Sequence, residues 1–179
     1  IFKMFGFENV AILDGGFSKW STEGRPVESG TFQVNASTYT TACDDRTRVR
    51  SKNDVLANCT SSAEQVIDAR DVARFTGEVD DAVHGLAGGH IPGARNVFFR
   101  DLLAEDSTFK SNGDLRAAFE TAGVDLTKPI TASCGSGMTA SVLLFALELL
   151  GHSQTALYDG SWSEWGADPN TPKEIGQYL

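Results

Sequence analysis

The fold is decided by the stretch Ile130-Thr131-Ala132-Ser133-Cys134-Gly135-Ser136-Gly137-Met138-Thr139-Ala140, followed directly by Ser141-Val142-Leu143-Leu144-Phe145-Ala146-Leu147. This pattern predicts a short strand, a tight loop that opens with a cysteine, and a helix from Met138 to Leu150. The helix is apolar on nearly every side, so we expect it to be buried against a sheet. Burial would hold the N-terminus of the helix, and with it the cysteine loop, rigidly in place.

The two glycines of this loop, Gly135 and Gly137, allow the backbone to curl so that successive N–H groups point inward. Such a nest at the positive end of a helix binds anions. A cysteine placed there is expected to be largely thiolate near neutral pH, and the thiolate is the nucleophilic form. The loop therefore predicts covalent catalysis at the sulfur of Cys134. The alternative is a buried structural cysteine beside a glycine-rich turn.

The composition excludes several classes of protein. The chain has 179 residues, enough for one ordinary domain and a remnant, and a net charge of −9 without a basic block argues against a nucleic-acid partner. No run is long enough for a membrane span, so we expect no membrane partner. The three cysteines, Cys43, Cys59 and Cys134, fit neither a disulfide scaffold nor a zinc site. They favour a reducing compartment, the cytoplasm, with mitochondria as the alternative.

A gapless internal repeat with an offset of 145 residues relates the two ends of the chain. In each copy a helix ends at a glycine, a strand follows (Asn9 to Leu13, and Thr155 to Tyr158), and an Asp-Gly turn enters a short helix. The matched pairs are Gly6 with Gly151, Asp14 with Asp159, Gly15 with Gly160, and Trp20 with Trp165. The repeat predicts a polypeptide with two similar domains. Residues 1–24 would be the C-terminal remnant of the first, residues 25–48 an extended interdomain linker, and residues 49–179 the second, catalytic domain.

Other stretches predict the elements around the loop. We expect Asn53 to cap a helix that carries Cys59 on or near its apolar face, and residues 65–68 to form a strand. A further helix is expected from Leu115 to Ala122, ending at Gly123. Trp162 and Trp165 are expected in the core or a pocket wall.

Four polar residues at or after the end of the strand at residues 65–68, the last of them in the turn that leads into the next strand, are candidates for a site. Ligands of α/β sheets gather at the carboxyl ends of strands, so Asp68 and Arg70 could serve a site, but we favour a pair that orders the loop. For Arg74, bidentate binding of a substrate carboxylate and simple solvation are equally consistent with the spacing. His90, in a His-Ile-Pro-Gly run, could act as a general base, but we favour a role in shaping the turn.

Four motifs together resemble the rhodanese superfamily of sulfurtransferases. They occur in the family's order: residues 66–70 (Val-Ile-Asp-Ala-Arg), residues 89–96 (Gly-His-Ile-Pro-Gly-Ala-Arg-Asn), the Cys134 loop, and residues 159–162 (Asp-Gly-Ser-Trp). The resemblance covers roughly residues 49 to 166 and implies a parallel sheet flanked by helices on both faces. The N-terminal repeat resembles the end of the inactive first domain of two-domain members.

Within the family, residues 134–139 resemble the loop of 3-mercaptopyruvate sulfurtransferases, with Met138 where valine is usual. Thiosulfate sulfurtransferases typically carry basic side chains just after the cysteine, whereas Gly135 and Ser136 are uncharged, which suits a monoanionic carboxylate donor. The resemblance implies that Cys134 takes the donor's sulfur as a persulfide, releases pyruvate, and passes the sulfur to a thiol such as thioredoxin or to cyanide. It implies no metal and no organic cofactor.

The resemblance also assigns roles to site residues. Cys134 and Ser136 would be catalytic, with Ser136 working with a histidine and an aspartate from the missing first domain. Arg74 matches the family's first carboxylate-binding arginine, while the second falls near Val83, with His84 beside it. The remaining substrate-binding residues would be Gly135, Gly137, Met138 and Thr139.

Phosphatases of the same fold also use a loop cysteine, but they require an arginine at the position of Ala140, so we discount phosphoryl transfer. Two alternative functions remain. One is a thiosulfate sulfurtransferase, and the other is a rhodanese module that carries sulfur or binds a partner without turnover of its own.

Overall fold

The computed structural model describes residues 2–7, 9–36, 38, 40 and 43–176. It contains two compact units, one formed by Ile1–Arg46 with Leu103–Phe109 and the other by Thr47–Leu102 with Lys110–Leu179. None of the described helices has the length and hydrophobicity that a membrane span requires.

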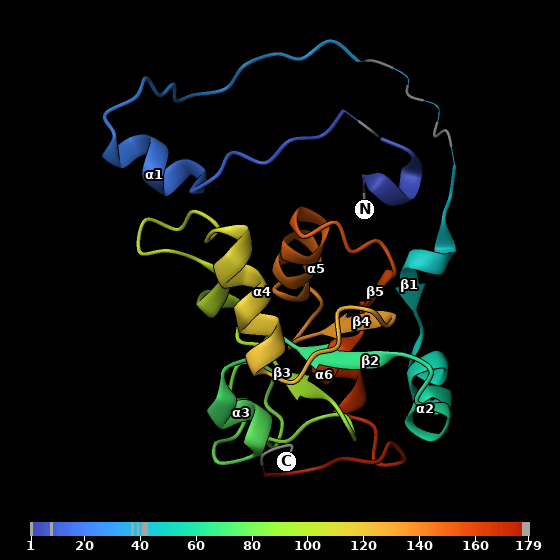
Figure 1. The fold of residues 1–179 in the computed structure, drawn as a ribbon. Helices are drawn as coiled ribbons and strands as arrows, with labels where there is room; N and C mark the ends of the chain where they lie inside the picture. Colours follow the sequence, from blue (N-terminus) through green and yellow to red (C-terminus); the bar gives the residue numbers. More distant parts are fainter. Residues whose placement is uncertain (1, 8, 37, 39, 41–42, 177–179) are drawn as a thin grey trace. The chain divides into compact units, whose positions relative to one another are not determined.

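The larger unit is built on a five-stranded sheet in which every neighbouring pair is parallel. The order across the sheet is β1-β5-β4-β2-β3, as Figure 1 shows. The bounds are β1 Val49–Arg50, β2 Gln65–Asp68, β3 Arg95–Asn96, β4 Ile130–Ser133 and β5 Thr155–Tyr158. The predicted strands at residues 65–68, 130–133 and 155–158 are confirmed.

Helices flank both faces of this sheet, as expected for the α/β class (Figure 1). Helix α5 packs on β4 and β5, and α2 lies along β1. The bounds are η2 Arg46–Arg48, α2 Lys52–Ser61, α3 Val72–Thr76, η3 Phe99–Leu102, α4 Asn112–Thr121, α5 Ala140–Leu149 and α6 Ser161–Trp165.

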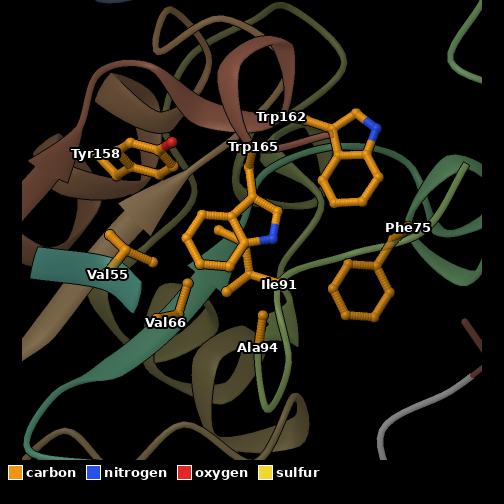
Figure 2. Close-up of a cluster of buried hydrophobic side chains, with 8 residues drawn as sticks. All are labelled: Val55, Val66, Phe75, Ile91, Ala94, Tyr158, Trp162 and Trp165. Carbon is orange, nitrogen blue, oxygen red and sulfur yellow. The ribbon is translucent and has the colours of Figure 1, made fainter. Parts of the chain in front are cut away.

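A buried cluster joins helices α2, α3 and α6 to strands β2 and β5 (Figure 2). Its members are Val55, Val66, Phe75, Ile91, Ala94, Tyr158, Trp162 and Trp165. The two tryptophans lie in the core, as predicted, and each indole N–H donates to a carbonyl, Trp162 to Ala87 at 3.0 Å and Trp165 to Pro172 at 2.7 Å. Buried indoles with satisfied N–H groups fix α6 against the sheet. Cys59 is packed against the cluster, as predicted.

The ends of two predicted helices are corrected. Helix α2 is capped by Ser51, two residues before Asn53, because Ser51 and Asp54 form a reciprocal capping box. Helix α5 begins at Ala140, two residues later than Met138, because the loop is still curled at Gly137 (φ 81°). One side of α5 is exposed, at Ser141 and Glu148 among others, so the helix is less completely buried than its composition predicts.

The smaller unit contains the first copy of the repeat. Helix η1 (Lys3–Phe5) ends at Gly6, and α1 (Gly16–Thr22) follows the predicted turn. The predicted strand Asn9–Leu13 is wrong: its side chains are exposed, Ile12 at 58%, and it pairs with none of the described residues. An isolated strand lacks the N–H and C=O partners that stabilise a ladder, so a buried-strand pattern alone does not form one.

The backbone nevertheless repeats at corresponding positions. Gly6 and Gly151 both end a helix in the left-handed region, with φ of 79° and 78°. Gly16 and Ser161, the first residues of α1 and α6, also share positive φ values of 61° and 50°. Between the two copies, the described residues from 25 to 45 form no helix or strand.

Candidate active site

The parallel sheet brings three strand ends together, because β2, β4 and β5 are neighbours that run in the same direction. Asp68 at the end of β2 is in register with Ser133 at the end of β4. The loops after these strands carry Arg70, Cys134 and the turn that leads to Ser161. The carboxyl edge of a parallel sheet is where ligands bind in this class of fold.

The turn between β5 and α6 fixes the backbone of the cysteine loop. The N–H of Cys134 donates to Oγ of Ser161 at 3.0 Å, and the same hydroxyl donates to the carbonyl of Tyr158 at 2.8 Å. In return, the N–H groups of Trp162 and Ser163 donate to the carbonyls of Cys134 and Gly135, at 2.9 and 2.8 Å. Three hydrogen bonds therefore hold the first two residues of the loop to α6, and the fourth ties Ser161 to the end of β5.

Gly137 allows the loop to approach this turn closely. Its φ is 81°, and a methyl group there would lie 2.8 Å from the carbonyl oxygen of Asp159 and 2.9 Å from its Oδ1. The positive φ and the short distance to Asp159 both require glycine at this position. No described residue accepts a hydrogen bond from the backbone N–H groups of residues 135–139. The loop thus keeps a set of donors without partners in the described part of the chain, as an anion-binding nest requires.

The exposure of the loop side chains is uneven. Cys134 is 1% exposed, whereas Met138 is 78% exposed and Ser136 also faces solvent. The hydroxyl of Ser136 makes no hydrogen bond with the described residues, and Thr139 precedes α5 without a capping bond from its side chain. The cysteine is therefore buried, whereas Ser136 and Met138 form the exposed part of the loop.

Asp68 and Arg70 form the structural pair that the sequence favoured. Both side chains are 1–2% exposed, and Nη2 of Arg70 lies 2.6 Å from Oδ2 of Asp68. The same Nη2 donates to the carbonyl of Gly89 at 2.7 Å, and the guanidinium stacks on the ring of Trp162 with its carbon 4.6 Å from the ring centre. The pair thus ties the end of β2 to the loop that precedes β3.

Arg74 is anchored by two carboxylates. Its Nε donates to Oδ2 of Asp71 at 2.6 Å, and its Nη1 lies 3.5 Å from Oδ1 of the buried Asp81. Burial opposes the charge of Arg74, but the hydrogen bond that Arg74 donates to Asp71 and the charges of both aspartates outweigh burial and hold the pKa of Arg74 above its ordinary value. The side chain is 23% exposed, so the guanidinium is both oriented and accessible.

Asp81 links Arg74 to the cysteine loop through a histidine that the sequence singled out only as the neighbour of Val83. Nδ1 of His84 lies 2.9 Å from Oδ1 of Asp81. The imidazole packs on Gly135: a methyl group there would lie 3.2 Å from both ring nitrogens and closer still to Cε1. Val83, by contrast, is 77% exposed. His84 and Ser161 are thus the loop's neighbours that motif spacing did not identify.

Asp81 is fully buried and surrounded by positive charge. Burial alone would raise the pKa of Asp81, but the hydrogen bond and charge of His84, with the charges of Arg74 and Arg70, hold it below the usual range. Nη1 of Arg70 lies 3.5 Å from Oδ2 of Asp81, close enough for an ion pair but without a hydrogen bond. The carboxylate is therefore an anchor that two arginines and a histidine share.

His90 has the structural role that the sequence favoured. It is buried, its Nδ1 donates to the carbonyl of Phe75 at 2.8 Å, and its ring stacks on that of Phe75 with 3.9 Å between centroids. In the described part of the chain, no group of three or more His, Cys, Asp or Glu side chains could hold a metal ion. The three cysteines are unpaired, and burial raises the pKa of the Cys59 thiol.

Comparisons with known proteins agree with this fold. A family model for the rhodanese-like domain matches residues 51–168. The 3-mercaptopyruvate sulfurtransferase of Escherichia coli (strain K12) is 42% identical over 172 residues, which are 96% of this chain and 60% of the relative. The thiosulfate sulfurtransferase of Cricetulus griseus is 39% identical over 180 residues, 99% of this chain and 60% of the relative.

Among solved structures, SseA from Escherichia coli, described as a 3-mercaptopyruvate sulfotransferase, superposes with a TM-score of 0.77 at 40% identity. The match covers 89% of this chain and 59% of SseA. The chain spans about 60% of the length of the curated relatives it matches. Because the family model covers most of the chain and the parallel sheet carries the cysteine loop at its carboxyl edge, the chain belongs to the rhodanese-like domain family.

Proposed function

We propose that this chain carries the catalytic cysteine of a sulfurtransferase and that Cys134 transfers sulfur as a persulfide. The observation that carries the proposal is the loop itself, a cysteine pinned at the end of β4 beside backbone N–H groups that have no partner among the described residues. Relatives at 42% and 39% identity are named 3-mercaptopyruvate sulfurtransferase and thiosulfate sulfurtransferase, which supports this chemistry.

The reaction divides into two balanced displacements. The Cys134 thiolate attacks the thiol sulfur of 3-mercaptopyruvate, the donor's C–S bond breaks, and the bonding electron pair leaves on carbon as the enolate of pyruvate. The proton of the donor thiol ends on that carbon, giving pyruvate and the Cys134 persulfide anion. An acceptor thiolate then attacks the outer sulfur, the S–S bond of the persulfide breaks, and the products are the acceptor's persulfide and the Cys134 thiolate. Each half is nucleophilic catalysis at sulfur.

The residues of the cysteine loop have different proposed roles. We assign the unpaired N–H groups of residues 135–139 to binding the thiolate and then the persulfide anion, which is the logic of an oxyanion hole. This gives Gly135, Gly137, Met138 and Thr139 their proposed contact with substrate through the backbone. Ser136, exposed at the rim, would act with groups from an upstream domain.

The donor we propose is 3-mercaptopyruvate, with thiosulfate as the alternative. Gly135 and Ser136 add no positive charge after the cysteine, so the loop suits a donor that carries a single carboxylate. Arg74, oriented by Asp71 and Asp81, would supply the guanidinium that binds this carboxylate. Ala140 is fully buried at the start of α5, so no guanidinium stands there for a phosphoryl group.

The proposal extends to the rest of the polypeptide. The matching backbone at Gly6 and Gly151, and at Gly16 and Ser161, supports residues 1–24 as the end of a first domain. Residues 25–48 would then be the linker and residues 49–179 the catalytic domain. We also propose a thiol such as thioredoxin as acceptor and a cytoplasmic location, which the three unpaired cysteines support.

The decisive experiment is the intact mass of the protein after incubation with 3-mercaptopyruvate and removal of excess donor. We expect the gain of one sulfur atom, its loss in Cys134→Ser, and its retention in the matched controls Cys43→Ser and Cys59→Ser. No gain in the wild type, or a gain that survives Cys134→Ser, would overturn the proposal. Steady-state kcat/KM values should then favour 3-mercaptopyruvate over thiosulfate, and the reverse order would reassign the donor.

A further inference from the structure

We propose that His84, oriented by Asp81, is a specificity-determining residue that binds the anionic group of the sulfur donor beside Gly135. This inference rests on the proposed function and deepens it. It assigns part of donor recognition to a side chain outside the cysteine loop.

The first step is the position of the ring. The imidazole occupies the space that a side chain on residue 135 would need, since a methyl group there would lie 3.2 Å from each of its nitrogens. Residue 135 directly follows Cys134, so a donor bound at the sulfur meets residue 84 where a loop side chain would otherwise stand. Because residue 135 is glycine, the imidazole ring of His84 has room beside the loop.

The second step is the orientation of the ring. Asp81 is fully buried and accepts a hydrogen bond from Nδ1 of His84 at 2.9 Å. Asp81 is itself fixed by Arg74 and Arg70, each 3.5 Å from one of its oxygens. With Nδ1 committed, Nε2 is the nitrogen available to a ligand, and no residue in the described ranges hydrogen-bonds to it. The side chain is 18% exposed, so a small solute can reach it.

The third step is the chemistry of the ring. The charged groups around His84 are Asp81 in direct contact, Arg74 and Arg70 beside the two oxygens of Asp81, and Cys134 next to Gly135, with Asp159 against Gly137. An imidazolium ring has two N–H donors, so with Nδ1 on Asp81 its Nε2–H group can donate a charge-assisted hydrogen bond to an anion.

The test compares His84→Gln and His84→Arg with the wild type in the full polypeptide, using 3-mercaptopyruvate as donor at one fixed pH. In His84→Gln, KM should be about tenfold higher than in the wild type, with kcat within about twofold, because one charge-assisted hydrogen bond is lost. His84→Arg should restore a low KM, because arginine also places a charged donor there. His152→Gln, beyond the other end of α5, is the matched control and should behave as the wild type.

A second experiment tests the contact with residue 135. Gly135→Ala should raise KM in the wild-type background by displacing the ring, and it should raise KM much less in a His84→Ala background. Additive effects of the two substitutions would overturn the proposal.

The outcomes also separate this inference from the proposed function. His84→Gln should still gain one sulfur atom at saturating donor. If it does and its KM matches the wild type, the role of His84 is overturned while sulfur transfer stands. If the wild type gains no sulfur, the proposed function itself fails. A His84→Gln variant that changes the rate of Cys134 alkylation, with KM unaltered, would overturn donor binding and assign the ring to the thiol instead.

Discussion

The hydroxyl oxygen of Ser161 lies 3.0 Å from the amide nitrogen of Cys134 and accepts its hydrogen, while the hydroxyl hydrogen goes to the carbonyl of Tyr158. Ser161 holds this position with a φ of 50°, in the left-handed region that disfavours side chains. The backbone of Ser161 is therefore strained in the conformation that fixes the peptide N–H of Cys134.

Replacement of Ser161 should separate the stabilisation by its hydrogen bonds from the cost of its backbone strain. Ser161→Ala leaves a buried N–H and a buried carbonyl unpaired and keeps the strain, so we expect a loss of about 2–3 kcal/mol in the free energy of unfolding. Ser161→Gly loses the same bonds but relieves the strain, so it should be more stable than Ser161→Ala by about 1 kcal/mol. Urea denaturation measures both. Equal stability of Ser161→Ala and the wild type would contradict the role of the hydroxyl.

Gly137 offers a second test of the loop. In Gly137→Ala the new methyl group would lie 2.8 Å from the carbonyl oxygen of Asp159, so either the loop or the turn after β5 must move. We expect the rate of persulfide formation to fall by at least about tenfold, because such displacements at a reacting group are costly. Gly151→Ala is the matched control: its φ of 78° is similar but nothing lies within 4 Å, so it should affect stability and leave the rate unchanged. An equal loss of rate in both variants would contradict the contact.

Arg74 should act on donor binding. In Arg74→Ala we expect KM for 3-mercaptopyruvate to rise about tenfold or more with a smaller change in kcat, as for loss of a charged hydrogen bond made in the ground state. Arg116 provides the control, since Arg116→Ala removes the same charge from an exposed side chain of α4 that pairs with Glu120. Unchanged KM in Arg74→Ala would return Arg74 to a purely structural role beside Asp71 and Asp81.

The sequence predicted the elements whose signal is local. Strands β2, β4 and β5 are four residues long and each contains two or three apolar residues, and the loop after β4 has its two glycines within three residues. The same pattern at residues 9–13 failed, because a strand also needs a neighbouring strand. Whether a neighbouring strand is present depends on the tertiary structure, and a sequence segment of five residues does not reveal it.

The two residues that spacing missed depend on contacts between distant loops. Ser161 reaches Cys134 from the turn after β5, and His84 reaches Gly135 from the stretch after α3. One signal for Ser161 was present in the repeat, where it is matched by Gly16, a residue free to adopt positive φ. For Arg74 the sequence left two interpretations open, and the structure adds the pairing with Asp71 and Asp81 that orients it.

Arg70 should be a major determinant of stability. Arg70→Met keeps most of the side-chain volume but leaves the buried Asp68 without its partner, so we expect the free energy of unfolding to fall by about 3–5 kcal/mol. Arg116→Met, which breaks an ion pair with Glu120 whose side chains are 51% and 58% exposed, should cost less than about 1 kcal/mol. Similar losses in the two variants would show that the buried pair is no stronger than a surface one.

Asp81 should make stability depend on pH in a defined direction. The folded state lowers the pKa of Asp81, so between that lowered value and the ordinary value of about 4 the unfolded chain binds more protons. The stabilisation is therefore complete above the ordinary value and is lost as the pH falls through the folded one. Asp81→Asn should be less stable than the wild type at pH 7, and the difference should shrink below about pH 4. Asp80→Asn, at the exposed neighbour, should show a small difference that does not follow this course. A gap between Asp81→Asn and the wild type that stays constant down to pH 3 would contradict the ionised, charge-anchored state of Asp81.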